Sequence, residues 1–355
     1  MTATAIPSTT FAAPDDRTAT EPPEHRGLAR DEVRLLVASP DGIVHTRFRD
    51  LPHHLRAGDL LVVNTSATLP AELDGRWRGS QPVVVHLASD LRDGTWVAEL
   101  RTAPDGAEPV LDASPGEVVR LPGRLRLAWI EPYPRPGSSP TGAGNRLGRV
   151  RVTGAPSVNR KLQRHGRPIA YGYLSGRFPL SDYQTIFAVD PGSAEMPSAG
   201  RPFTTNLVSE LVSAGIGVAP ITLHAGVSSQ DAGEAPQAEW FNVPAATAQQ
   251  VTATREAGGR VIAVGTTVTR ALESAASADG AVGAATGWTT LVIEPTRGVQ
   301  VTDGLITGWH NPEASHLLLV EAVAGARLTQ CAYDAAVAEH YRWHEFGDSG
   351  LLLSR

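Results

Sequence analysis

Residues 260–274 contain the change of pattern that most restricts how this chain can fold. The apolar run at 261–264 is typical of a buried β-strand, and helical spacing follows at 268–272. A glycine separates the two patterns, so Thr266 and Thr267 lie at a strand-to-helix turn. Their hydroxyl and backbone N–H groups can face an anionic ligand there, or they can simply cap the helix.

The rest of the chain predicts two kinds of domain. Short alternating runs separated by Gly, Pro and Asp clusters occupy residues 71–155, a pattern typical of a small antiparallel barrel or sandwich. Strands and helical patterns occupy residues 28–70 and 156–355. We therefore expect an α/β (α+β) domain, formed by these two segments, that is interrupted in sequence by an inserted all-β barrel-like domain. Residues 1–27, rich in Thr, Ala and Pro, predict a disordered leader.

Composition excludes several classes of site. The 355 residues, 41% of them hydrophobic, are enough to bury at least one full core. The single cysteine, Cys331, forbids an internal disulfide and argues against an iron–sulfur or zinc centre held by cysteines. It lies in a helical pattern at 328–343, where we expect a buried, inert thiol. The one lysine, Lys161, lies in a polar run, which excludes a Walker-type phosphate loop and disfavours a Schiff-base enzyme.

No segment predicts secretion or a membrane span. The N-terminal residues have neither a cationic start nor an apolar core. The longest apolar stretch, at 317–326, is too short to cross a bilayer and contains Glu321. We expect a cytoplasmic protein without a membrane partner.

Charge gives weak support to a nucleic-acid partner. The formal net charge is −6, whereas affinity for nucleic acid comes largely from basic groups that neutralise phosphates. A local basic cluster nevertheless falls within twenty residues, and it fits either a solvated surface or an RNA contact equally well. Its members are Arg149, Arg151, Arg160, Lys161, Arg164 and Arg167.

Short motifs are distributed along nearly the whole chain. They are Gly58-Asp59-Leu60-Leu61-Val62-Val63-Asn64, Leu69-Pro70-Ala71, Tyr183-Gln184-Thr185, Pro197-Ser198-Ala199-Gly200, Thr222-Leu223-His224, Glu239-Trp240, Val264-Gly265-Thr266-Thr267, Asp303-Gly304-Leu305-Ile306-Thr307, His310 with Pro312, Tyr341-Arg342 and Phe346-Gly347-Asp348. In this order they resemble segments of the S-adenosylmethionine:tRNA ribosyltransferase-isomerase family of queuosine biosynthesis. Each motif is weak alone, but the ordered set is specific.

The resemblance implies a two-domain enzyme whose α/β domain is catalytic and carries a β-barrel insert. It also implies a reaction in which the ribosyl part of S-adenosylmethionine, as co-substrate, is transferred and isomerised onto an aminomethyl group of a modified guanine in tRNA. Adenine and methionine leave, and no metal is required. Such a reaction needs a base, an acid or hydrogen-bond donor for the departing adenine, and fixed polar groups that stabilise developing charge.

The catalytic candidates are His224, His310 and Glu239. His224 ends a strand-like apolar run, and an imidazole titrates near neutrality, so it is the first candidate for acid–base work; His310, in a turn, is the second. Glu239 can serve as a base or as an orienting carboxylate, and each of the three has a purely structural alternative. We expect Arg270 to pair with Glu273, three residues on along one helix. The candidate substrate-binding residues are Asn64, Tyr183, Gln184, Thr266, Thr267, Arg270 and Asp303.

The chain departs from the family pattern at polar positions. Residues 65–72 contain neither of two arginines that the family carries there, and Glu72 stands at one of these positions. Residues 199–203 lose a histidine, with Pro202 in its place. Loss of arginine removes bidentate recognition of phosphate or carboxylate. Two alternatives to the family reaction therefore stay open: a small-molecule acceptor, or a non-catalytic protein that binds a nucleoside or S-adenosylmethionine.

Overall fold

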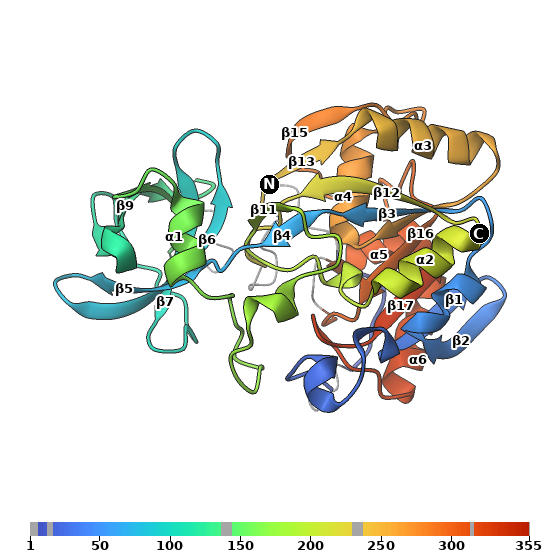
Figure 1. The fold of residues 1–355 in the computed structure, drawn as a ribbon, viewed down its shortest axis with the longest axis horizontal. Coiled ribbons are helices and arrows are strands. Elements are labelled where there is room, and N and C mark those ends of the chain that lie inside the picture. Colours follow the sequence, from blue (N-terminus) through green and yellow to red (C-terminus); the bar gives the residue numbers. More distant parts are fainter. Residues whose placement is uncertain (1–5, 13–16, 136–143, 229–236, 313–315, 355) are drawn as a thin grey trace.

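The computed structural model describes residues 6–12, 17–135, 144–228, 237–312 and 316–354, which form a large mixed sheet and a separate barrel (Figure 1). The strands of the sheet are β1 (Arg34–Ser39), β2 (Gly42–Arg47), β3 (Leu60–Asn64), β12 (Gly217–Leu223), β13 (Glu239–Val243), β14 (Val261–Val264), β15 (Ala285–Thr289), β16 (Gly304–Gly308) and β17 (Ser349–Leu353). Their order is β15-β13-β12-β3-β14-β16-β17-β1-β2. The central strands β12, β3, β14 and β16 run parallel, so their carboxyl ends share one edge.

Helices cover both faces of this sheet. One face carries α3 (Ala245–Glu256), α4 (Thr266–Ala275), α5 (His316–Ala324) and α6 (Ala326–Ala338), and the other carries α2 (Thr205–Ser213) and the 3-10 helix η3 (Phe48–His54). Successive residues of β3 serve the two cores alternately, since Leu60 and Val62 pack with the first set of helices and Leu61 and Val63 with the second. A strand buried on both faces must be apolar throughout, which explains the continuous apolar runs of β3 and β14.

The second body is a closed barrel in the order β10-β7-β6-β5-β8-β9. Its strands are β5 (Glu72–Trp77), β6 (Gln81–Asp90), β7 (Trp96–Thr102), β8 (Val118–Arg120), β9 (Arg126–Pro132) and β10 (Leu147–Thr153). The predicted combination of an α/β domain with an inserted all-β barrel is confirmed. Gly148 has a packing role inside the barrel, because a Cβ there would lie 2.0 Å from the Trp129 ring.

Short elements lie between the sheet and the barrel. Strand β4 (Ser66–Thr68) directly follows β3 and pairs in parallel with β11 (Asp190–Ser193). Helix α1 (Val158–His165) follows the last barrel strand, with Ser157 as its N-cap. These elements bring residues distant in sequence to the junction of the two domains (Figure 1).

The expectation of a disordered leader does not hold for residues 6–12 and 17–27. Thr9 donates from its backbone N and its Oγ1 to Glu321 at 2.6 Å each, and the Phe11 ring stacks on Tyr333 with centroids 4.8 Å apart. Ala19 is fully buried. A buried carboxylate that needs donors and an aromatic anchor therefore hold a segment whose composition suggested no fixed structure. The remainder of the leader, residues 1–5 and 13–16, lies outside the described residues.

The expected burial of the cysteine was wrong. Cys331 is exposed on α6, because the apolar face of that helix buries Ala332, Tyr333 and Ala336 instead. The helices themselves are short: among those in the described ranges, none is long and apolar enough to span a bilayer.

Candidate active site

The carboxyl edge of the parallel strands gathers most of the predicted residues. Strand β3 ends at Asn64, β12 is followed by His224, β14 by the Gly265 turn and β16 by Trp309 and His310. Ligands in α/β sheets bind at this edge, where loops and helix N-termini meet. The one clear exception is Asp303, which precedes β16 and therefore lies at the opposite edge. There Asp303 accepts a hydrogen bond from the Val261 N at 2.9 Å, which is a structural role.

Asn64 joins three elements at this edge. Its Oδ1 accepts hydrogen bonds from the backbone N of Ser66 and of Leu223, both at 3.0 Å. Its Nδ2 donates to the Leu223 O at 2.9 Å and to the Thr267 Oγ1 at 3.3 Å. The buried amide thus uses both of its donors and its acceptor to hold β3, β12 and the start of α4 together.

The predicted strand-to-helix turn is present, with a different cap. The N-cap of α4 is Gly265, at φ 100°, and no side chain caps the helix. Thr266 and Thr267 are the first helical residues, so the alternative prediction that a threonine caps the helix was wrong. Glycine is needed because an L side chain rarely adopts this φ. The N-terminus of α4 opens toward the carboxyl edge of the sheet, where backbone N–H groups favour a carboxylate or a phosphate.

His224 is held in one orientation by a chain of hydroxyl groups. Its Nδ1 lies 2.7 Å from the Ser66 Oγ, which lies 2.6 Å from the Ser193 Oγ. The Ser193 Oγ in turn accepts the Ala225 N at 3.0 Å. The other ring nitrogen, Nε2, lies 3.8 Å from a carboxylate oxygen of Asp190. Burial lowers the pKa of His224 to about 4, so the imidazole is neutral at pH 7.

A cavity of about 210 Å³ opens beside His224, between the barrel and the sheet. This volume has room for about seven water molecules. Its walls come from β6 and β7 of the barrel, from α1 and β11 at the junction of the domains, and from β13, β15 and the residue that follows β12 at the sheet. Aromatic side chains contribute flat apolar surfaces to these walls; the lining residues are Leu69, Ser89, Asp90, Arg92, Trp96, Asn159, Pro191, Gly192, His224, Trp240 and Trp288.

Trp240 is the central aromatic wall of this cavity. Its ring stacks with His224, with centroids 5.1 Å apart and an interplanar angle of 21°. The guanidinium carbon of Arg92 lies 3.6 Å from the Trp240 ring centroid. Gly192 completes the fit, because a Cβ there would lie 2.4 Å from the His224 ring. Such an arrangement suits a flat heterocycle, which stacks on aromatic side chains and on guanidinium planes.

Glu239 and Arg270 form an ion pair that the sequence did not reveal. An Arg270 Nη contacts the Glu239 carboxylate, and the same guanidinium donates to the carbonyls of Gln237 and Leu291, each at 3.2 Å. Burial raises the pKa of Glu239, and the Arg270 charge opposes that rise. The expected pairing of Arg270 with Glu273 was wrong. Glu273 instead accepts from backbone N–H groups at 300–302 and from Arg297.

His310 belongs to a different group of rings from His224. Its ring centroid lies 3.7 Å from that of His316, whose Nε2 lies 2.9 Å from the Thr307 Oγ1. Burial lowers the pKa of His310 well below its usual value, and the neighbouring imidazoles lower it further. Strands β12 and β16, which precede the two histidines, are three strand positions apart in the sheet, or about 14 Å. The structure places both at one edge, in separate environments.

Tyr183 ends the 3-10 helix η5 (Leu180–Tyr183), and Gln184 begins the loop that leads to β11. Gln184 bonds to the backbone N and O of Thr68, at 3.0 and 2.8 Å, which fixes that loop to β4. Tyr183 is buried against Phe346, with ring centroids 5.2 Å apart. Within the described ranges, its buried hydroxyl has no hydrogen-bond partner.

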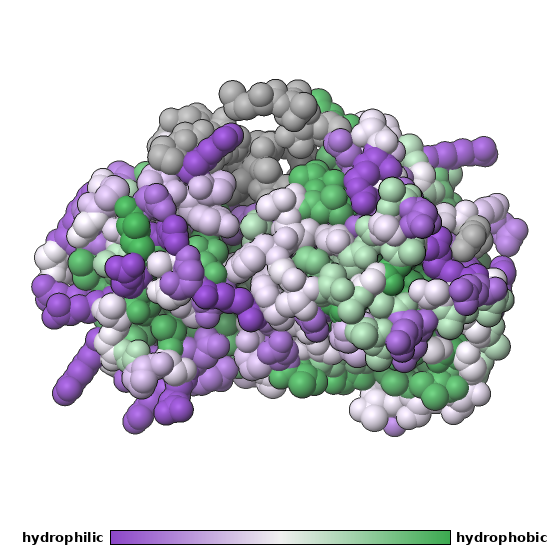
Figure 2. All heavy atoms as spheres, turned by 90° about the horizontal axis from the view of Figure 1, so that it is seen from above, coloured by the Kyte–Doolittle hydropathy of each residue, from purple (hydrophilic) through white to green (hydrophobic). Residues whose placement is uncertain are grey.

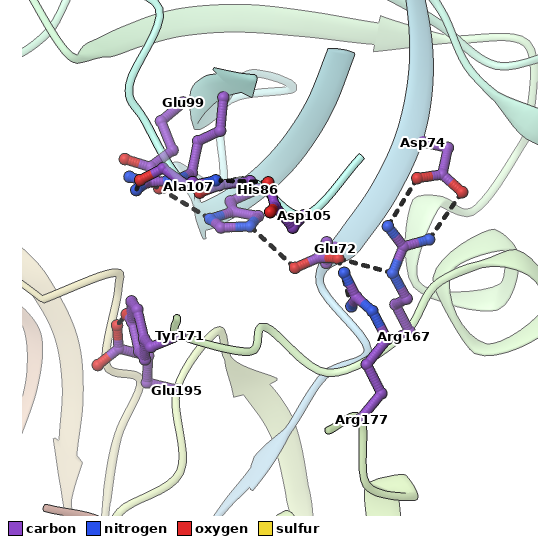
Figure 3. A network of polar contacts seen from close by, with 12 residues as sticks. Glu72, Asp74, His86, Glu99, Asp105, Ala107, Arg167, Tyr171, Arg177 and Glu195 are labelled. Atoms are coloured by element: carbon purple, nitrogen blue, oxygen red, sulfur yellow. Dashed lines mark hydrogen bonds and ion pairs between the residues drawn. The ribbon is translucent and has the colours of Figure 1, made fainter. Parts of the chain in front are cut away.

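A buried charge network at the base of the barrel was missed entirely (Figure 3). His86 bridges two carboxylates: its Nε2 lies 3.1 Å from Glu72 and its Nδ1 lies 2.8 Å from Glu99. Arg167 and Arg177 each donate to the same Glu72 oxygen at 2.6 Å. Burial opposes ionisation of His86, but its hydrogen bonds to both carboxylates raise its pKa. Glu72, His86 and Glu99 lie directly opposite one another on the strand face that also carries exposed Asp74 and Arg76. Alternation within the strands therefore predicted that they point away from the barrel core, and nothing local showed that Arg167 and Arg177 would cover them.

Tyr171 and Glu195 lie close to this network without joining it (Figure 3). The Tyr171 hydroxyl donates to Glu195, whose carboxylate also accepts the Ser228 N at 2.7 Å. Burial raises the pKa of Glu195 to about 7. Nowhere in the described ranges do three or more His, Cys, Asp or Glu side chains group in a way that could hold a metal ion.

The sequence of this chain is similar to those of known proteins over nearly its whole length. A family model described as a queuosine biosynthesis protein matches residues 7–352. The chain is 34% identical over 370 residues to the S-adenosylmethionine:tRNA ribosyltransferase-isomerase of a Nostoc species, covering 97% of this chain and 90% of the relative. It is 35% identical over 358 residues to the protein of the same name from Sphingopyxis alaskensis, covering 97% and 95%.

A solved structure has the same architecture. The crystal structure of S-adenosylmethionine tRNA ribosyltransferase from Thermotoga maritima matches with a TM-score of 0.53 and 27% sequence identity, over 97% of this chain and 99% of that one. The match thus includes both the sheet and the barrel. Because sequence and fold agree over nearly the whole length, the chain belongs to the queuosine biosynthesis family of S-adenosylmethionine:tRNA ribosyltransferase-isomerases.

Proposed function

We propose that this chain transfers and isomerises the ribosyl group of S-adenosylmethionine onto an aminomethyl-modified guanine of tRNA, releasing adenine and methionine. The observation that carries the proposal is His224, held neutral and oriented in the wall of an aromatic cavity between barrel and sheet. The reaction itself is proposed because the chain belongs to this family. The chain has this cavity and this histidine although its polar residues at 65–72 and 199–203 depart from the expected family pattern. Neither alternative, a small-molecule acceptor or a non-catalytic binding protein, therefore gains support.

The cavity is the proposed place of the acceptor base. A deazaguanine ring is flat and can stack on Trp96, on Trp288 or on the Arg92 guanidinium that covers Trp240. When the aminomethyl nitrogen forms its bond to the ribosyl carbon, it loses a proton. We assign this proton to the Nε2 of His224, because Ser66 holds the opposite nitrogen. The Asp190 carboxylate, 3.8 Å from Nε2, would stabilise the imidazolium that forms.

S-adenosylmethionine is proposed to lie along the same sheet edge. The N-terminus of α4, at Thr266 and Thr267, suits the carboxylate of its methionine part. Asn64 acts by positioning this helix against β3 and β12. The Tyr183 hydroxyl and the His310 ring are the remaining candidates for contact with the substrate, while Glu239 and Arg270 act as a paired support. We place the reaction in the cytoplasm, where tRNA is modified.

The test is product release. Purified protein is incubated with S-adenosylmethionine, with and without tRNA that carries the aminomethyl deazaguanine, and adenine and methionine are measured by mass spectrometry. The proposal predicts that both products form in equal amounts and only with this tRNA. Release with unmodified tRNA, or without any RNA, would show that the acceptor is different. Absence of release under all conditions would contradict the enzyme itself.

A further inference from the structure

Three arginines lie side by side on the outer surface of the barrel. In the register of the barrel, Arg76 of β5 is directly opposite Arg120 of β8, and Arg120 is directly opposite Arg126 of β9. All three side chains are exposed. Directly opposed residues project from the same face at neighbouring positions, and like charges placed in this way destabilise a sheet. The row spans about 10 Å across the three strands.

Among the described residues, no ion pair neutralises this row; Asp74 attracts Arg76, but its carboxylate is hydrogen-bonded to Arg167. Other arginines of the barrel surface do have acidic partners: Arg78 pairs with Asp112 and Glu117, and Arg149 pairs with Asp93 and Glu131. In the part of the chain that the structure describes, Arg76 donates to the carbonyl of Ser80, and Arg120 and Arg126 form no ion pair. The contrast indicates a surface organised to receive negative charge from another molecule.

The row continues along α1 toward the cavity. Lys161 of this helix donates to the Gly123 O at 3.0 Å, next to the exposed Arg124 that lies between β8 and β9. Arg160 and Arg164 are exposed on the same helix. The residue before Arg160, Asn159, lines the cavity beside His224. Helix α1 thus connects the cavity, through Asn159, with the turn between β8 and β9, through Lys161.

These residues form one surface, which we name the basic band. It consists of Arg76, Arg120, Arg124, Arg126, Arg160, Lys161 and Arg164. Only part of it coincides with the cluster seen in the sequence, since Arg149 and Arg167 of that cluster are neutralised by carboxylates. The arginines of the row come instead from strands that are far apart in sequence. Figure 2 shows hydrophilic side chains projecting from the barrel end of the molecule.

We propose that the basic band binds the phosphate backbone of the tRNA whose acceptor base enters the cavity. This inference rests on the proposed function. Guanidinium groups bind phosphates bidentately, and a row of them beside the cavity would fix the register of the RNA without reading its sequence. The net charge of −6 favours binding of the RNA at the basic band, because the rest of the molecule is on balance acidic and repels RNA.

The test compares two double variants of the full chain. Arg120→Gln with Arg126→Gln removes the centre of the row, and Arg56→Gln with Arg327→Gln removes two exposed arginines of the α/β domain as a control of equal charge. Binding of tRNA is measured by fluorescence anisotropy over a range of salt concentrations. In the variant with Arg120→Gln and Arg126→Gln, which we call the row variant, the slope of log K against log salt is expected to become less steep. Its magnitude should decrease by about 1 for each phosphate that the variant no longer neutralises. The control is expected to keep the wild-type slope.

Thermal unfolding and kinetics complete the test. The row variant is expected to unfold at the wild-type temperature or above it, because like-charge repulsion is relieved. Its KM for tRNA is expected to rise while kcat stays the same. Equal slopes and equal KM for wild type and row variant would overturn the band and leave the proposed function intact. If the wild-type protein binds tRNA through the basic band but transfers no ribosyl group to it, the proposed function is overturned and the basic band is not.

Discussion

At the scale of single residues, His224 is distinguished by its combination of fixed orientation and low pKa. Many histidines in proteins are structural, and His310 here packs against another imidazole ring. His224 instead has one nitrogen held by Ser66 and the other beside Asp190, at the wall of a cavity. A general base must be unprotonated and correctly oriented before it reacts. Burial keeps His224 unprotonated, and the chain of hydroxyl groups fixes its orientation.

We expect His224→Gln to lower kcat/KM for tRNA by about 100-fold or more, since general acid–base groups contribute at least this much. Glutamine keeps hydrogen-bonding capacity toward Ser66 but cannot take the proton. The matched control is His53→Gln, an exposed histidine on η3, which should retain wild-type kinetics. Steady-state rates of methionine release with saturating S-adenosylmethionine check this. Equal rates for both variants would remove His224 from the mechanism.

The same histidine makes stability depend on pH. Its pKa is about 4 in the folded chain, below the usual value of 6.5, so the unfolded chain binds the proton first. The stability that it contributes is therefore fully present above pH 6.5 and is lost as pH falls toward 4. Between about pH 7.5 and about pH 5, wild type should lose about 2 kcal/mol more than His224→Gln. Denaturant unfolding at both pH values measures the difference, and parallel losses would contradict it.

At the scale of elements, the barrel depends on a buried charge network as well as on its apolar core. Glu99 is fully buried, and burial alone would raise its pKa. The hydrogen bond and charge of His86, with the charges of Arg146 and Arg101, hold that pKa at about 2. The negative charge of Glu72 is compensated by Arg167 and Arg177, which come from beyond the barrel.

Breaking this network should be far more costly than breaking a surface pair. We expect Glu99→Gln to lower the free energy of unfolding by about 3–5 kcal/mol, because it leaves buried cations without a counter-charge. Asp112→Asn, which removes an exposed partner of Arg78, should cost less than about 1 kcal/mol. Chemical denaturation of the two variants provides the comparison. A cost for Glu99→Gln as small as that of the control would show that the network is dispensable.

The same scale explains what could be predicted from sequence. The turn from β14 to α4 depends on neighbouring residues, so local pattern was sufficient to predict it. The Glu239–Arg270 pair and the arginine row depend on which strands become neighbours, and no local pattern contains that information. Asp303 shows the same limit, because its motif did not reveal at which edge of the sheet it lies.

At the scale of the whole molecule, the two domains have complementary tasks. The sheet presents Asn64, His224 and the start of α4 at one edge, and the barrel closes the cavity from the other side with Arg92 and Trp96. The basic band lies on the outer surface of the barrel and along α1, whose Asn159 lines the cavity. An inserted barrel thus both completes the proposed acceptor pocket and provides the surface for the polymer that carries the acceptor.

The most direct test of this account follows the ribosyl carbons themselves. S-adenosylmethionine labelled with carbon-13 in its ribose is incubated with the protein and the aminomethyl-modified tRNA, and the tRNA is digested to nucleosides for mass spectrometry. The account predicts that the label appears in the modified guanine of the tRNA, in an amount equal to the adenine released. Adenine release with the label left in solution, or an unlabelled tRNA with intact S-adenosylmethionine, would contradict it.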